Sequence, residues 1–306
     1  MTAAGTAPGA ARGTTPDAKE LAKLRRIAAL RSQVAAWRRA GESVAIVPTM
    51  GALHDGHLAL VRRARSDCDR VITTIFVNPM QFNRRDDLSG YPRDEAGDAA
   101  KLAEMGVDVL FAPAAEEVYP EGYQTRVSVP LLSDCLCGAA RPGHMEGVAT
   151  VVAKLLLQSL PDAAYFGEKD YQQLLVIRRM ARDLDIPVRI EAVATVREAD
   201  GLALSSRNLL LTPAQRDQAT AMYRVLSELA ARLKDGRTPA QPALAWARAA
   251  LTEAGFDPID YLELRGADSL QPLERAEQPA RLFAAAWLGQ VRLIDNLAIA
   301  TGCAND

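Results

Sequence analysis

One short stretch of this chain decides its fold: Val47-Pro48-Thr49-Met50-Gly51-Ala52-Leu53-His54-Asp55-Gly56-His57. The apolar run that ends at Val47 predicts a buried strand, and the residues after His57 have the pattern of a helix. Two histidines therefore lie at a strand-to-helix turn. In an open α/β sheet such turns lie at the carboxyl ends of the strands, where ligands bind, and the first N–H groups of the helix can bind an anion. The stretch predicts a phosphate-binding site.

The chain after this turn alternates between predicted strands and helices. Residues 71–77 form a continuous apolar and β-branched run, typical of a central parallel strand. Further strands and helices are predicted at residues 91–106 (helix), 109–111 (strand), 148–160 (helix), 163–166 (strand), 171–184 (helix) and 188–193 (strand). One or two helices are expected before the first strand, over residues 17–41. The alternation indicates an α/β fold, a Rossmann-like domain with a doubly wound parallel sheet.

The pattern changes after residue 203. Two helices and then three strands are predicted over residues 213–233, 239–254, 259–264, 281–288 and 291–294. This order is typical of a smaller α+β domain. We therefore expect a disordered tail over residues 1–16, a Rossmann-like nucleotide- and substrate-binding domain over residues 17–203, and a C-terminal α+β lid domain over residues 204–306.

Composition limits the classes of partner. The 306 residues are 49% hydrophobic, which allows a sizeable core. A formal net charge of -2 argues against a nucleic-acid or anionic-membrane binder, because those proteins carry a basic excess or a basic face. The longest apolar run, residues 148–160, is too short to span a bilayer and contains Lys154. The four cysteines include no C-x-x-C pair, so we interpret them as reduced thiols of a cytoplasmic protein that binds small molecules.

All three histidines of the chain, His54, His57 and His144, fall at predicted loop-to-helix junctions beside glycines. A histidine taken at random is more often a solvated or core residue than a functional one. His54 and His57, however, are three residues apart at a helix start, so both rings can face one ligand. This pair favours a functional role.

The spacing Gly51-x4-Gly56 resembles a P-loop, but the next residue is His57 where a P-loop has its lysine. The turn thus offers backbone N–H groups and imidazoles to a phosphate without the P-loop cation. The cation would have to come from elsewhere in the chain, and Lys169, in a loop after a predicted strand, is a candidate. With it, the histidines would form a clamp that stabilises negative charge.

The pair of elements His54-x-Gly56-His57 and Leu204-Ser205-Ser206-Arg207-Asn208 resembles the HIGH and KMSKS pair of the class I aminoacyl-tRNA synthetase and nucleotidyltransferase superfamily. Within it, the chain is most similar to the pantothenate synthetase (pantoate-β-alanine ligase) family. The other segments that carry this resemblance are Phe76-Val77-Asn78-Pro79-Met80-Gln81-Phe82, Tyr91-Pro92-Arg93, Arg141-Pro142-Gly143-His144, Gly147-Val148-Ala149-Thr150-Val151-Val152 and Phe166-Gly167-Glu168-Lys169-Asp170-Tyr171-Gln172-Gln173. Several motifs in the right order are far more specific than any one of them.

The resemblance implies a ligation in two steps. ATP and pantoate give pantoyl adenylate and pyrophosphate, and the amine of β-alanine then attacks the activated carbonyl to give pantothenate and AMP. Mg²⁺ is expected with ATP, held largely by phosphates and water, with Asp170 as a weak candidate protein ligand. The C-terminal domain is expected to move, because β-alanine must enter after pyrophosphate leaves. A homodimer is also implied by the resemblance.

The same resemblance implies roles for individual residues. The donors that stabilise the growing negative charge, each worth about 3 kcal/mol, would be His54, His57, Lys169, Ser205, Ser206 and Arg207. ATP would be bound by Met50, Gly51, Ala52, Leu53, His54, Asp55, Gly56, His57, Gly167, Glu168, Lys169, Asp170, Val196, Leu204, Ser205, Ser206 and Arg207. Gln81, Gln173 and His144 would bind pantoate or β-alanine. The side-chain amides of the two glutamines offer both a donor and an acceptor to a hydroxy acid.

Two other classes of function remain open. A nucleotidyltransferase would use the same histidine chemistry but release a stable adenylylated product. A Rossmann-like binding module without catalysis would leave the coincidence of histidine, lysine and serine-arginine loops unexplained. A tRNA synthetase is disfavoured, because no anticodon-binding domain or basic RNA surface is evident.

Overall fold

The structure is a computed structural model that describes residues 21–82 and 88–299. The tail predicted over residues 1–16 lies outside the described residues. Within the described ranges, no helix is both long and apolar enough to cross a membrane.

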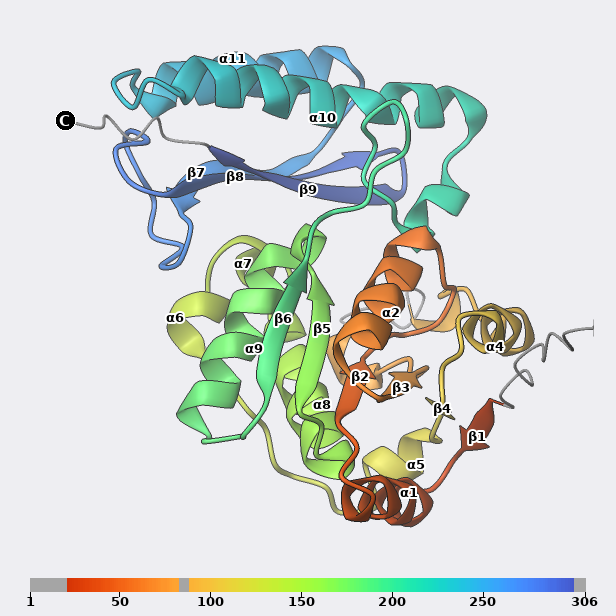
Figure 1. The fold of residues 1–306 in the computed structure, drawn as a ribbon. Helices are drawn as coiled ribbons and strands as arrows, with labels where there is room; N and C mark the ends of the chain where they lie inside the picture. Colours follow the sequence, from red (N-terminus) through yellow and green to blue (C-terminus); the bar gives the residue numbers. More distant parts are fainter. Residues whose placement is uncertain (1–20, 83–87, 300–306) are drawn as a thin grey trace, which may run out of the picture.

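The larger sheet has six parallel strands in the order β1-β4-β3-β2-β5-β6 (Figure 1). They are β1 (Ala22–Leu24), β2 (Val44–Val47), β3 (Arg70–Thr74), β4 (Val109–Phe111), β5 (Ala163–Gly167) and β6 (Arg189–Val193). β2 pairs with β3 on one side and with β5 on the other, and β5 pairs with β6. After β2 the chain moves to β3 on one side of the sheet, whereas after β5 it moves to β6 on the other side. The carboxyl ends of β2 and β5 form the topological switch point, where open α/β sheets bind ligands.

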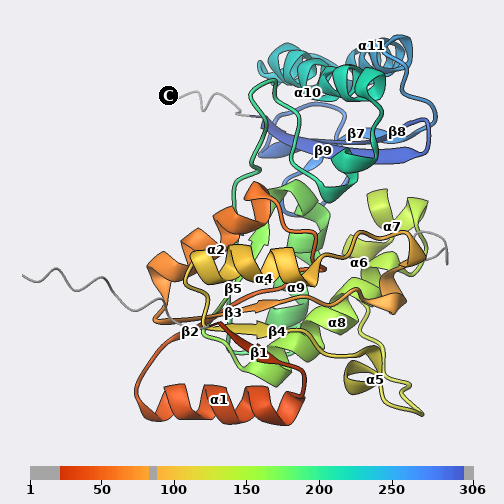
Figure 2. The ribbon, with the colours of Figure 1, turned by 90° about the vertical axis from the view of Figure 1, so that its right-hand side faces the viewer.

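Helices cover both faces of this sheet. They are α1 (Ile27–Arg39), α2 (Asp55–Asp67), α4 (Glu95–Glu104), α5 (Ala115–Val118), α6 (Pro130–Ser133), α7 (Leu136–Ala140), α8 (His144–Ser159) and α9 (Tyr171–Asp183), with short 3-10 turns η1 (Pro79–Gln81) and η2 (Glu168–Asp170). Along β2, Val44 and Ile46 pack in the core shared with α1, α8 and α9, whereas Ala45 and Val47 pack against α2 and α4. This alternation is that of a strand buried on both faces. Figure 2 shows α1 below the sheet and α4 above it.

A second, smaller layer follows the turn η3 (Ser206–Leu210). It consists of α10 (Pro213–Leu233), α11 (Ala240–Glu253), β7 (Ile259–Gly266), β8 (Ala280–Leu288) and β9 (Val291–Ile299). The three strands form an antiparallel sheet in the order β7-β8-β9, and the two helices cover one face of it. Its other face looks toward the carboxyl edge of the parallel sheet (Figure 1). Phe283 of that face contacts Tyr171 at the start of α9, with ring centroids 6.1 Å apart.

The predicted fold class is confirmed: a Rossmann-like parallel sheet with a smaller α+β part. The prediction over residues 17–41 was wrong in its first part, because residues 22–24 form a strand rather than a helix. β1 pairs in parallel with β4, with Ala22 opposite Val109. Backbone pairing at the sheet edge therefore overrides the helical spacing of the apolar residues there. The domain boundary at residue 203 stays a prediction.

Candidate active site

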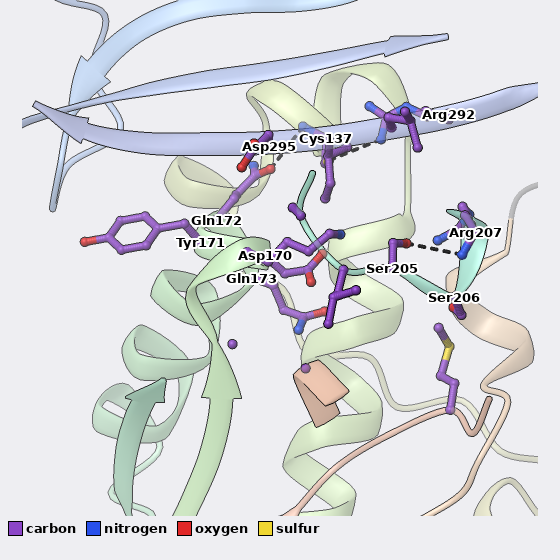
Figure 3. Close-up of a pocket in the computed structure, with 18 of the residues that line it drawn as sticks. Cys137, Asp170, Tyr171, Gln172, Gln173, Ser205, Ser206, Arg207, Arg292 and Asp295 are labelled. Carbon is purple, nitrogen blue, oxygen red and sulfur yellow. Dashed lines mark hydrogen bonds between the residues drawn. The ribbon is translucent and has the colours of Figure 1, made fainter. Parts of the chain in front are cut away.

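A cleft of about 760 Å³ lies between the carboxyl edge of the parallel sheet and the C-terminal sheet (Figure 3). It brings together most of the residues expected from the sequence: Met50, His54, Gly56, His57, Gln81, His144, Gly167, Lys169, Asp170, Gln173, Val196, Leu204, Ser205, Ser206 and Arg207. Five predicted ATP-binding residues do not line it: Gly51, Ala52, Leu53, Asp55 and Glu168. The assembly follows from topology, because the histidine turn follows β2 and the Lys169 loop follows β5, on either side of the switch point.

The two histidines of the first turn are oriented by their own backbone. His54 is the N-cap of α2, and its Nδ1 accepts the N–H of Gly56 at 3.2 Å. In return, the Nδ1 of His57 accepts the N–H of His54 at 3.3 Å. The ring centroids lie 4.1 Å apart. A ring nitrogen that accepts a hydrogen bond carries no proton, so each neutral ring holds its proton on Nε2. Both rings are thus fixed as Nε2–H donors.

The same two histidines are neutral at physiological pH. Burial, together with the positive charge of Lys169, lowers the pKa of His54 to about 4. Burial, together with the adjacent His54, lowers the pKa of His57 to about 3. The histidines therefore enter the expected clamp as neutral hydrogen-bond donors. The positive charge of the expected clamp would come from Lys169 and Arg207, which both line the cleft.

Helix α4 supports the histidine turn from outside the cleft. Asp98 is 1% exposed, and its Oδ1 accepts the N–H of Leu53 at 2.8 Å. One turn later, the Nζ of Lys101 donates to the carbonyl of Leu53 at 2.7 Å. Gly51 has a positive φ of 88°, and a Cβ there would lie 3.2 Å from Asp98 Oδ2. Leu53 and Gly51 thus shape the turn without facing the cleft. The sequence-based prediction missed Asp98 and Lys101, because nothing in a helical pattern indicates which loop a side chain contacts.

Gln81, in the turn η1 that follows β3, is held by buried polar contacts. Asn78 donates from Nδ2 to Gln81 Oε1 at 3.1 Å and to the carbonyl of Gly147 at 3.0 Å. The hydroxyl of Tyr119 donates to Asn78 Oδ1 at 2.8 Å. The Gln81 side chain also reaches back to the histidine turn, since its Nε2 lies 2.8 Å from the sulfur of Met50. The amide of Gln81 is therefore held in one orientation in this wall of the cleft.

His144 begins α8 as predicted, but both of its ring nitrogens have protein partners. Its Nδ1 donates to the carbonyl of Gln81 at 2.8 Å, and its Nε2 lies 3.3 Å from Arg141 Nη1. Burial, with the charge of Arg141, lowers the pKa of His144 to about 4. The ring thus supports the Gln81 turn, and direct contact of His144 with substrate stays a prediction.

Two adjacent glutamines in the first turn of α9 have different surroundings. Gln172 is buried, donates to the carbonyls of Leu132 and Cys135 at 2.8 Å, and accepts the N–H of Cys137 at 3.0 Å. Gln173 lines the cleft (Figure 3). Both glutamines line the cleft, and Gln172 also ties α9 to the α6–α7 segment.

Asp170 carries a negative charge that acts on all three histidines, raising the pKa of each against the effect of burial. Among residues 21–82 and 88–299, no group of three or more His, Cys, Asp and Glu side chains could hold a metal ion. The donor set fits Mg²⁺ only if nucleotide phosphates and water supply most of its ligands, with Asp170 adding one.

The serine-arginine loop is held by local bonds and by Tyr91. Ser205 Oγ accepts the N–H of Arg207 at 3.2 Å, as Figure 3 shows. The hydroxyls of Ser206 and Tyr91 lie 3.4 Å apart. Tyr91 also lines the cleft, a contact that the motif Tyr91-Pro92-Arg93 alone does not predict.

The cleft also has a wall that the sequence did not predict. Arg292, Asp295 and Asn296 of β9 line it. The available signal was the pair Asp295-Asn296, two consecutive polar residues within the strand Val291–Ile299.

Comparison with known proteins agrees with this geometry. The family model described as Pantoate-beta-alanine ligase matches residues 22–298. A pantothenate synthetase from Roseobacter denitrificans is 57% identical over 274 residues, which cover 90% of this chain and 96% of that protein. The crystal structure of pantothenate synthetase from Thermus thermophilus is 48% identical, covers 91% of this chain and 99% of its own, and has a TM-score of 0.85.

A third relative was crystallised with ligands. The pantoate-beta-alanine ligase from Francisella tularensis, described as complexed with beta-gamma ATP and beta-alanine, is 36% identical. It covers 92% of this chain and 99% of its own, with a TM-score of 0.79. Fold, site and comparisons lead to one conclusion: the chain belongs to the pantoate-β-alanine ligase family.

Proposed function

We propose that this acid-amine ligase joins pantoate to β-alanine through a pantoyl adenylate formed from ATP in the cleft at the β2–β5 switch point. The observation that carries the proposal is the convergence there of the His54–His57 turn, the Lys169 loop and the Ser205–Arg207 loop. The Francisella relative, crystallised with an ATP compound and β-alanine, supports the same ligands for this chain.

In the first step, a carboxylate oxygen of pantoate attacks the α-phosphorus of ATP. The bond from that phosphorus to the bridging oxygen breaks, and pyrophosphate leaves with the electron pair. Negative charge grows on the α-phosphate and on the leaving group, where preorganised donors in a site that excludes water are most effective. We assign the two Nε2–H donors of His54 and His57, together with Lys169 and Arg207, to this charge. Ser205 and Ser206 would add neutral donors.

In the second step, the amine of β-alanine attacks the acyl carbon of the adenylate. The C–N bond forms, the amine loses a proton, and AMP leaves with the electrons of the C–O bond. The acyl group must stay in place while pyrophosphate leaves and the amine enters. We assign Gln81 and Gln173, which follow β3 and β5 on either side of β2 and line the cleft, to the hydroxyls and carbonyl of the pantoyl group. His144 would keep the Gln81 turn in that position.

Mg²⁺ is part of the proposal as a companion of ATP. Bound to the phosphates, it would neutralise part of their charge. Asp170 is the protein group proposed to contact it, directly or through water. The side chain lines the cleft beside Lys169.

We also propose that the protein works as a cytoplasmic homodimer with a Rossmann-like domain to residue 203 and a mobile lid beyond it. The family resemblance supports the dimer. The free thiols of Cys68, Cys135 and Cys137 agree with a reducing compartment.

Pyrophosphate–ATP isotope exchange tests the proposed pathway. With pantoate present and β-alanine absent, label should pass from pyrophosphate into ATP, because adenylate formation is reversible on the enzyme. Omission of pantoate should abolish the exchange. Exchange that does not need pantoate, or accumulation of a free adenylylated product, would favour a nucleotidyltransferase instead.

A further inference from the structure

We propose that Asp295 and Asn296 of β9 are positioning residues that hold the two cation-bearing loops of the active site in one arrangement. Asn296 would position the loop of Lys169, and Asp295 the segment that leads into Ser205–Arg207. The inference rests on the proposed roles of Lys169 and Arg207, and it adds that the C-terminal sheet sets the geometry of adenylate formation.

Asn296 is bonded directly to the backbone of the Lys169 loop. It is 4% exposed, and its Nδ2 donates to the carbonyls of Glu168 and Lys169 at 2.9 and 2.8 Å. Both protons of the amide are thereby used on consecutive residues of η2. Since the carbonyl of Lys169 is fixed, the direction in which its side chain leaves the backbone is fixed as well.

Arg281 holds the other end of the Asn296 side chain. Its guanidinium donates to Asn296 Oδ1. The same guanidinium lies 3.7 Å from the ring centroid of Tyr171 and 3.5 Å from Glu168 Oε2. The amide orientation is therefore determined: its oxygen faces Arg281 and its nitrogen faces the loop. Residues 168–171 are thus held by β8 and β9 together.

Asp295 is bonded to the segment that leads into the Ser205–Arg207 loop. It is 4% exposed, and its two oxygens accept from Arg197 at 2.6 and 2.8 Å. Arg197 also donates to the carbonyl of Gly201 at 3.0 Å and forms a β-bridge with Ala203. That short hairpin runs directly into Leu204 and Ser205. A bidentate carboxylate-arginine pair fixes orientation as well as distance, so it orients the base of this loop.

The position of the pair in β9 allows this double role. β9 is an edge strand, and consecutive residues of a strand point to opposite sides. Asp295 and Asn296 can therefore contact different loops from neighbouring positions. Figure 3 shows Asp295 on the C-terminal sheet, above the loop of Asp170.

The energetics favour a positioning role over simple packing. Buried polar groups give little net stability over well-packed apolar ones, yet leaving one unpaired is costly. The face of this sheet toward the cleft packs in part through apolar residues such as Phe283 and Ala285. Asn296 lies on that face where the Lys169 loop meets it, and Asp295 points to the other side, where it meets Arg197. The clearest gain from the polar pair is geometric, because a displacement of about 1 Å in a reacting group can slow catalysis by about 10²-fold.

A double-mutant cycle on the full-length enzyme tests the inference. The variants are Asn296→Ala, Lys169→Ala and their combination, followed by pantoate-dependent pyrophosphate exchange. Asn296→Ala alone should lower the exchange rate at saturating ATP on the order of tenfold or more, with a smaller change in the KM for ATP. If Asn296 acts through Lys169, the same substitution should have little further effect in Lys169→Ala.

Asp295→Asn paired with Arg207→Ala forms the second cycle, and a smaller coupling is expected because Asp295 acts through Arg197. Glu263→Gln is the matched control for Asp295→Asn. It removes a carboxylate that pairs with Arg265 on β7, and Glu263 does not line the cleft. Its exchange rate should match that of the unmodified enzyme.

The outcomes separate the inference from the function on which it rests. Equal losses from Asn296→Ala in both backgrounds, or no loss at all, would overturn the positioning role alone. Full exchange activity in Lys169→Ala would overturn the proposed site and the inference together. If Asn296→Ala does not fold, Asn296→Asp replaces it, because aspartate keeps the oxygen that faces Arg281 but places a second oxygen against the two carbonyls.

Discussion

The turn that carries the two histidines and the loops that carry the cations are held in place in different ways. His54 and His57 are oriented by hydrogen bonds within four residues of chain, with further support from α4. The backbone at Lys169 is bonded directly to Asn296 of β9, and the segment that precedes Arg207 is connected to Asp295 of β9 through the Arg197 side chain; both β9 residues lie more than 80 residues later in the chain. The neutral donors are thus a local property of one turn, whereas the position of the charges depends on the whole molecule.

This difference has a physical reason. A helix N-terminus leaves backbone N–H groups that a capping side chain can use, so a short sequence can orient two imidazoles. A lysine or arginine side chain has no comparable local support, because its charge stands at the end of a long, flexible stem. Its backbone must therefore be fixed from outside the loop.

The largest effect is expected from removing the positive charge of Lys169, whose loop is positioned by β9. Lys169→Ala should lower the rate of adenylate formation by about 10²–10³-fold, the usual effect of losing one donor to a developing negative charge. Because Lys169 is only partly buried, the melting temperature should change little. Pantoate-dependent exchange and thermal unfolding, compared with the exposed-lysine control Lys234→Ala, measure both effects. Equal rates in the two variants would remove Lys169 from the site.

The local region makes a prediction about pH. The pKa values of His54 and His57 are lowered to about 4 and about 3, so the folded protein binds these protons only below those values, whereas the unfolded chain binds them near pH 6.5. Between pH 6.5 and about 4 the unfolded state therefore holds more protons, and stability must fall as the pH falls. The slope is at most about 1.4 kcal/mol per pH unit for each histidine.

The measurement is the free energy of unfolding in urea at several values between pH 7 and pH 4.5, for the unmodified protein and for His57→Asn. The variant should show a shallower decline, because one of the protons bound on unfolding is gone. Parallel curves would mean that the His57 ring titrates normally in the folded state, which would contradict its burial as a neutral donor.

The contrast between the regions also explains what could be predicted from sequence. The strand 44–47, the histidine turn and the strand 109–111 follow from local patterns, and family resemblance, fold class and ligase function are confirmed by the structure and the comparisons. Local patterns could not show that Asp98 and Lys101 hold Leu53, or that Asp295 and Asn296 contact the cation loops. These contacts join segments 45 residues or more apart, and a hydrophobic period carries no information about such pairs. The residue roles at the site stay predictions until they are tested.

The smallest effect is expected from removing the contact between α4 and the histidine turn. Lys101→Met keeps the aliphatic stem but removes the bond from Nζ to the Leu53 carbonyl and a positive charge that lowers the pKa of both histidines. The Lys101 side chain is 45% exposed, so water can replace part of this hydrogen bond. The variant should therefore lose about 1 kcal/mol of transition-state stabilisation, which lowers the exchange rate roughly fivefold.

Because the histidine rings are oriented mainly by their own backbone, Lys101→Met should leave the KM for ATP nearly unchanged while the pKa values of the two histidines rise. Titration of the imidazole proton resonances by NMR measures those pKa values directly. A loss in rate as large as that of Lys169→Ala would show that the histidine turn, too, depends on distant contacts, and the distinction between the two regions would fail.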